Sequence, residues 1–145
     1  MSRFAIVISR YYGELAERLE AGAVAAFDEA GAAYEVHEVA GAFELPLGCR
    51  YAIDSGRFDG VIALGAVIRG ETTHYDVVCD NASRGIMDLQ MATGVPVALG
   101  LLTVENLDQA LARTGGGKRD EGRHAAEAAL RMAALRQELT GSPTA

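Results

Sequence analysis

The chain has 145 residues, a length that fits one domain with a full hydrophobic core. Half of its residues are hydrophobic and its mean hydropathy is +0.10, which excludes an intrinsically disordered chain. The formal charge of −7 argues against a nucleic-acid-binding protein, because such a protein needs a basic face. The acidic average still leaves room for a local basic pocket that binds a phosphate.

The first residues, MSRFAIVIS, lack the basic and then apolar pattern of a signal peptide. No apolar run reaches the ~20 residues that a membrane-spanning helix needs. We therefore expect a cytoplasmic protein in a reducing compartment. Under those conditions Cys49 and Cys79 are expected to be small buried hydrophobic residues.

Apolar runs alternate along the chain with segments of helical periodicity. The predicted strands are 4–9, 34–39, 60–67 and 95–103. The predicted helices are 14–30, 46–55, one capped by Asp80 or Asn81 and ending at Thr93, 105–113 and 123–138. The second strand alternates polar and apolar residues, which indicates a more exposed position near an edge of the sheet.

Strands that alternate with helices predict an α/β fold, in which a parallel sheet is covered on both faces. The sequence contains no internal repeat and no linker, so residues 1–145 are expected to form a single domain. Residues 140–145 are expected to be a frayed tail.

The most informative stretch is GVIALGAVIRGETTHYD, residues 60–76. Its first eight residues are uncharged and typical of a strand buried on both faces, and a polar loop follows at 68–74. Open α/β sheets bind ligands at the carboxyl ends of their strands. Loops at 10–12 and 41–44 also follow strands, so a parallel sheet places all three loops on one edge. Their aromatic, carboxylate, hydroxyl and imidazole groups suit a polar heterocycle that carries hydroxyl groups.

His74 is the only histidine expected on that edge. An imidazole in a cleft can transfer protons near neutral pH, but the residues alone fit an ordinary surface-loop histidine equally well. His37 and His124 are expected to be solvated. His74 and Cys79 lack a third partner, so they give only a weak signal for a metal site or a Cys–His nucleophile pair.

Residues 114–119, TGGGKR, resemble a phosphate-binding loop at first sight. They fail the Walker pattern, because Ala112 stands where its first glycine belongs and Arg119 stands where a serine or threonine belongs. The segment also follows a predicted helix instead of a strand. Basic residues nevertheless cluster between 113 and 123, and they fit either an anion clamp or a solvated helix end.

Three parts of the chain resemble the lumazine synthase family. They are VAGAFELP at 39–46, GAVIRGETTHYD at 65–76, and TGVPV at 93–97 together with LTVEN at 102–106. They occur in the family's order and spacing, and the match runs from about Phe4 to Leu139. The middle segment is highly specific to the family.

The resemblance implies a flavodoxin-like, three-layer α/β/α sandwich whose four-stranded parallel core sheet has the order 2-1-3-4. It implies a transferase of riboflavin biosynthesis, 6,7-dimethyl-8-ribityllumazine synthase. This enzyme condenses 5-amino-6-(D-ribitylamino)uracil with 3,4-dihydroxy-2-butanone 4-phosphate and releases phosphate and water. No cofactor and no metal are implied. The implied assembly is a homopentamer with active sites between adjacent subunits, without nucleic-acid or membrane partners.

The resemblance also implies roles for single residues. His74 matches the family's proton-transfer residue, and Tyr11 matches the aromatic residue that stacks on the pyrimidine. Two further segments match residues that hold the ribityl chain and the pyrimidine ring: Ala42, Phe43 and Glu44, and Ala66, Val67 and Ile68.

Four more positions complete the implied site. Glu71 and Thr72 match positions whose backbone N–H groups help to hold the phosphate, and Arg113 matches the guanidinium partner of that phosphate. Leu99 stands at a position, often phenylalanine in the family, that a neighbouring subunit contributes to the pocket.

Several positions depart from the family's pattern. Ala40 replaces a common proline, Tyr12 replaces a common asparagine, and Leu99 lacks the ring that would stack. Residues 115–122, GGGKRDEG, differ from the usual GTKAGNKG at a bend associated with sixty-subunit capsids, and little sequence precedes the first strand. We therefore expect a homopentamer and not a capsid.

Two other functions remain open from the sequence. One is an archaeal-type riboflavin synthase, which resembles this family but dismutates the lumazine product. The other is a non-catalytic protein that binds flavin or lumazine. His74 and Arg113 favour the enzyme over the carrier, because binding alone needs neither a proton relay nor a phosphate clamp.

Overall fold

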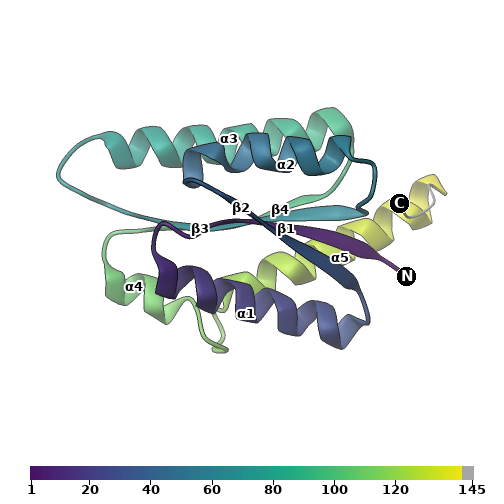
Figure 1. Ribbon diagram of the computed structural model, residues 1–145, viewed down its shortest axis with the longest axis horizontal. Coiled ribbons are helices and arrows are strands. Elements are labelled where there is room, and N and C mark those ends of the chain that lie inside the picture. Colours follow the sequence, from purple (N-terminus) through teal and green to yellow (C-terminus); the bar gives the residue numbers. More distant parts are fainter. Residues whose placement is uncertain (142–145) are drawn as a thin grey trace.

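A parallel sheet of four strands forms the centre of the computed structural model, which describes residues 1–141 (Figure 1). The strands are β1 (Arg3–Ser9), β2 (Ala33–Val39), β3 (Gly60–Ile68) and β4 (Val97–Val104). Their order in the sheet is β2-β1-β3-β4, which confirms the predicted order. β2 lies at one edge and is only partly buried, as its alternating sequence predicted.

Helices cover both faces of this sheet, as predicted (Figure 1). They are α1 (Gly13–Ala30), α2 (Leu45–Asp54), α3 (His74–Thr93), α4 (Leu107–Ala112) and α5 (Glu121–Thr140), with a short 3₁₀ turn, η1 (Ala42–Glu44). Successive side chains of a strand point to opposite faces. In β1, Phe4, Ile6 and Ile8 therefore pack with α1 and α5, and Ala5 and Val7 pack with α2.

The start of α3 differs from the prediction. The helix begins at His74, so the predicted cap at Asp80 or Asn81 is wrong. Asn81 lies inside the helix, where its side-chain amide donates a hydrogen bond to the Val77 carbonyl at 2.8 Å. Buried Val78 lies one turn before buried Ala82, so the apolar face of the helix already exists before residue 80.

The end of the chain also differs in part from the prediction. Thr140, expected in the frayed tail, is the last residue of α5, and its hydroxyl donates to the Arg136 carbonyl at 2.6 Å. Gly141 ends the helix with a φ of 68°, a left-handed conformation that glycine adopts without strain. Residues 142–145 lie outside the described part of the chain.

Close packing of α1 against α5 depends on two glycines. A side chain at Gly122 would collide with the backbone carbonyl of Leu19, and one at Gly22 would collide with the carboxylate of Asp120. Asp120 is buried and caps α5, because it accepts a hydrogen bond from the Arg123 N–H at 3.2 Å. The α4–α5 loop and the start of α5 are therefore held directly on α1.

Replacing Gly122 with alanine should destabilise the protein by about 1–3 kcal/mol, because the obstructing atoms belong to backbone that cannot rotate away. Urea unfolding at a fixed subunit concentration measures the change. Gly13→Ala is the matched control, since nothing lies within 4 Å of the added methyl group near the start of α1. Equal unfolding midpoints for the two variants would contradict this description of the contact.

Candidate functional site

A cavity of about 660 Å³ opens at the carboxyl ends of β1, β2 and β3. Its size lies within the roughly 300–1,000 Å³ typical of small-molecule sites. Nine of the site residues expected from the sequence line it: Tyr11, Ala42, Phe43, Glu44, Ala66, Val67, Ile68, Thr72 and His74. The three loops that follow these strands therefore meet at one edge, as the sequence predicted.

The first loop carries a pair of aromatic rings. Tyr11 is 76% exposed, and its ring meets the ring of Tyr12 edge-on, with centroids 5.0 Å apart and an angle of 82° between the planes. Tyr12 packs against the core of the α1 face and also lines the cavity. A ring that is exposed on one side and supported on the other is suited to stacking on a flat heterocycle.

The second loop is a turn of 3₁₀ helix, η1, that leads directly into α2. Ala42 is buried beneath the cavity, while Phe43 is 56% exposed and Glu44 is exposed. The Glu44 N–H donates to the Gly41 carbonyl at 3.1 Å, and Pro46 stands in the first turn of α2 as predicted. The turn thus presents an aromatic ring and a carboxylate to the cavity from a well-defined backbone.

The third loop joins β3 to α3 and carries the imidazole. Ala66, Val67 and Ile68 are the last three residues of the strand; Ala66 is buried, and Val67 and Ile68 are half-buried. His74 is exposed at the first position of α3, and its N–H donates to the Thr72 hydroxyl at 3.3 Å. The loop therefore places an imidazole and several backbone N–H groups at the mouth of the cavity.

Three expected site residues do not line this cavity: Glu71, Leu99 and Arg113. The side chain of Glu71 is exposed, although its neighbours Gly70 and Thr72 do line the cavity. Leu99 lies on β4, 42% exposed, where it lines a second hollow between α3 and α5. The guanidinium of Arg113 donates to the Gln109 carbonyl at the end of α4, at 2.9 Å.

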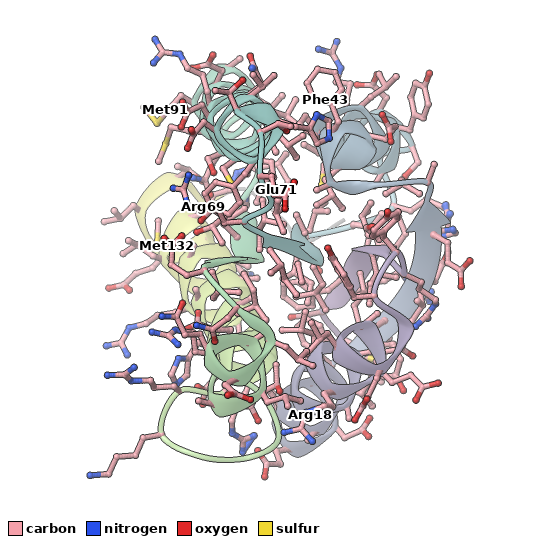
Figure 2. The ribbon with its side chains drawn as sticks, turned by 90° about the vertical axis from the view of Figure 1, so that its left-hand side faces the viewer. Arg18, Phe43, Arg69, Glu71, Met91 and Met132 are labelled. Atoms are coloured by element: carbon pink, nitrogen blue, oxygen red, sulfur yellow. The ribbon has the colours of Figure 1, made fainter. Side chains whose placement is uncertain are left out.

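The segment TGGGKR that follows Arg113 makes hydrogen bonds with other parts of the same chain. Arg18 of α1 donates to the Thr114 hydroxyl at 2.7 Å and to the Leu111 carbonyl at 3.3 Å. Figure 2 shows Arg18 on α1, close to the loop that joins α4 to α5. The Gly116 N–H donates to Asp120, so at least this amide is already occupied.

Sequence reasoning missed Arg18, because it is separated from Thr114 by 96 residues and sits in an ordinary helical pattern. Tyr12 belongs to the loop at 10–12 that was expected at this edge, but it was not among the expected site residues, although its ring lines the cavity. Tyr75 also lines the cavity and was missed. The predicted loop ended at His74 and the predicted helix began only at Asp80 or Asn81, so Tyr75 was assigned to neither.

The remaining histidines and the cysteines do not line this cavity. His37 is exposed on β2 beside Glu35, and His124 is exposed on α5. Both thiols are free and buried, as predicted, and burial raises the pKa of Cys49 to about 12. Within residues 1–141, no three His, Cys, Asp or Glu side chains gather as a metal site, and no helix has the length and hydrophobicity to span a membrane.

Comparison with known proteins gives one family. A family model described as 6,7-dimethyl-8-ribityllumazine synthase matches residues 1–137. Proteins with that same name include one from Agrobacterium fabrum, 45% identical over 94% of this chain and 95% of its own length. A second comes from Sphingopyxis alaskensis and is 46% identical over 96% of this chain and 98% of its own length. A third comes from Novosphingobium aromaticivorans and is 47% identical over 94% of this chain and 98% of its own length.

The match covers nearly the whole chain, including all three loops that form the cavity. The strand order and the cavity that lies at the carboxyl edge are those that the resemblance implied. The chain therefore belongs to the 6,7-dimethyl-8-ribityllumazine synthase family.

Proposed function

We propose that this protein makes 6,7-dimethyl-8-ribityllumazine from 5-amino-6-(D-ribitylamino)uracil and 3,4-dihydroxy-2-butanone 4-phosphate. The observation that carries the proposal is the gathering of nine expected residues around one cavity, with His74 at its mouth. We place the reaction in the cytoplasm, which the two free, buried cysteines support.

Proton transfer is the role that we assign to His74. An amine of the pyrimidine attacks the carbonyl of the second substrate and forms an imine with loss of one water. Phosphate is then eliminated, and the second amine closes the ring with loss of a second water. Each of these steps moves a proton, and one imidazole can relay it, which contributes typically ~10²–10⁴-fold in rate. Most of the remaining acceleration comes from holding the two substrates together in the cavity.

The pyrimidine and its ribityl chain fit the wall formed by the first two loops. The exposed ring of Tyr11 stacks on the heterocycle, and Phe43 and Glu44 contact the ring and the hydroxyl groups. The ends of β3 supply the opposite wall through Ala66, Val67 and Ile68.

The phosphate fits the other end of the cavity. The backbone N–H groups of Glu71 and Thr72 lie just before the amino end of α3, where the helix dipole favours an anion. We assign the counter-charge to Arg113, which in one chain lies outside the cavity. A second copy of the chain must therefore bring this guanidinium to the site.

We also propose that the protein is a homopentamer with active sites between adjacent subunits. The open edge of β4 supports this assembly, because large apolar side chains are exposed along it: Met87 and Met91 of α3, Leu99 of β4, and Met132 and Leu135 of α5. Figure 2 shows Met91 and Met132 on the same side of the molecule. Met87, Leu99 and Met132 line one hollow, and a cluster of exposed apolar side chains of this kind is typical of a protein–protein interface.

Activity is tested by mixing the protein with both substrates and following lumazine absorbance. His74→Ala should lower kcat by about 10²-fold or more, since no other residue assigned to the site transfers protons. His37→Ala is the matched control, because that histidine is exposed on β2 and does not line the cavity. Unchanged turnover in His74→Ala would refute the role of the imidazole. Tight flavin binding without any turnover would favour the carrier.

The mass of the assembly tests the pentamer. Light scattering should give about 77 kDa, five times the chain mass of 15.3 kDa, and Leu99→Asp should lower it by placing a charge in an apolar interface. Ala21→Asp, on the exposed side of α1, should leave the mass unchanged. A mass near one chain would refute the assembly, and a mass near sixty chains would refute the pentamer.

A further inference from the structure

Arg69 connects three elements at the point where β3 ends. Its N–H donates to the Val104 carbonyl at 2.9 Å, which ties it to the end of β4. Its Nε donates to the Glu105 carboxylate at 2.6 Å. On the other side, a terminal nitrogen lies 3.5 Å from the carboxylate of Asp76, and the guanidinium carbon lies 4.3 Å above the centre of the Tyr75 ring.

These contacts surround the loop between β3 and α3, whose side chains are not packed into the hydrophobic core. Every residue from Arg69 to His74 is exposed, so no burial of apolar side chains fixes the backbone of this stretch. Figure 2 shows Arg69 and Glu71 at the carboxyl edge of the sheet, beneath α3. Arg69 holds the loop at one end through its own backbone and at the other through Tyr75 and Asp76, both in the first turn of α3.

The ion pairs themselves add little to global stability. The side chains of Arg69, Asp76 and Glu105 are 42%, 53% and 56% exposed, and exposed pairs contribute at most about 1 kcal/mol each. The hydrogen bond to Glu105 raises the pKa of Arg69, so the guanidinium stays charged at any working pH. The contact therefore acts mainly on geometry, because a planar guanidinium holds two carboxylates and a ring in fixed directions.

We propose that Arg69 is a positioning residue: it holds the 70–73 loop and the first turn of α3 so that His74 and the N–H groups of Glu71 and Thr72 face the cavity. The proposal rests on the proposed function of this site. Arg69 is not among the residues that line the cavity, whereas its contact Tyr75 is. Its effect on the reaction therefore passes through the loop and not through the substrate.

The position of the loop predicts which substrate is affected. The 70–73 loop lies where we place the phosphate. The pyrimidine is held by Tyr11, by η1 and by the end of β3, and pairing with β4 fixes the end of β3 without the Arg69 side chain. Loss of the arginine should raise KM for the phosphorylated substrate and lower kcat, and should leave KM for the pyrimidine nearly unchanged. A purely structural role would lower thermal stability and affect both substrates alike.

The test is a double-mutant cycle with Arg69→Gln, Glu105→Gln and both together. Displacement of the loop should lower kcat/KM for the phosphorylated substrate about 10- to 100-fold in each single variant. The double variant should be no worse than Arg69→Gln alone, because the Glu105 carboxylate acts on the loop through its contact with Arg69. Arg69→Lys should not restore activity, since an ammonium cannot reproduce the planar contact with Glu105 and Tyr75.

Arg84→Gln is the matched control, because this exposed arginine of α3 lies 3.9 Å from Asp88 and away from the cavity. Hydrogen exchange gives a readout that does not depend on the substrates: amides of residues 70–77 should exchange faster in Arg69→Gln and not in Arg84→Gln. The inference would be overturned if the parent protein is active and its Arg69→Gln variant keeps both normal kcat/KM and normal hydrogen exchange in residues 70–77. Additive losses in the double variant, or equal rises in both KM values, would overturn it as well. An inactive parent protein would instead refute the proposed function.

Discussion

The parallel pairing of β1 with both β2 and β3 is the constraint on which the cavity depends. Because the three strands run in the same direction, the loops that follow them emerge at one edge, although they lie far apart in the sequence. An aromatic pair from the first loop, an aromatic ring and a carboxylate from the second, and an imidazole from the third thereby meet around one space. The hydrophobic layers on both faces of the sheet hold those loops in place, and core residues such as Ala42, Ala66 and Val78 also form part of the cavity wall.

A single chain leaves both the cavity and an apolar surface incomplete. The cavity is bordered by exposed Phe43 and Glu44 and by the exposed loop at 69–74. Beside the edge strand β4, methionine and leucine side chains of α3, β4 and α5 are also exposed. Arg113 and Leu99, both implied by family resemblance, lie outside the cavity of their own chain. A ring of identical chains uses two different surfaces of each subunit, so it can cover the apolar edge and complete the cavity with the same contact. In this account the same contact between subunits forms the assembly and completes the active site.

The pattern of buried and alternating residues predicted the edge position of β2 and the meeting of the three loops, because side-chain periodicity is a local property of the sequence. The strand order was implied only by the family resemblance, because strand pairing depends on contacts between distant segments. The sequence analysis placed the start of α3 too late, because Asp80 and Asn81 look like caps. The helix begins at His74, and Thr73, the residue at the cap position, makes no side-chain cap hydrogen bond. The roles of Arg18 and Arg69 could not be predicted from the sequence, because folding alone brings each of them to its partner, Thr114 and Glu105. Side-chain partners of this kind leave no periodic signal in a sequence.

The most direct measurement mixes two inactive variants, His74→Ala and Arg113→Ala, by co-expression in one cell. If each active site takes its imidazole from one subunit and its guanidinium from the next, random mixing restores about a quarter of the sites. The account predicts that mixed assemblies regain lumazine synthesis to about that level, while each variant alone stays inactive. Mixed assemblies confirmed by mass spectrometry that remain as inactive as the single variants would contradict the account.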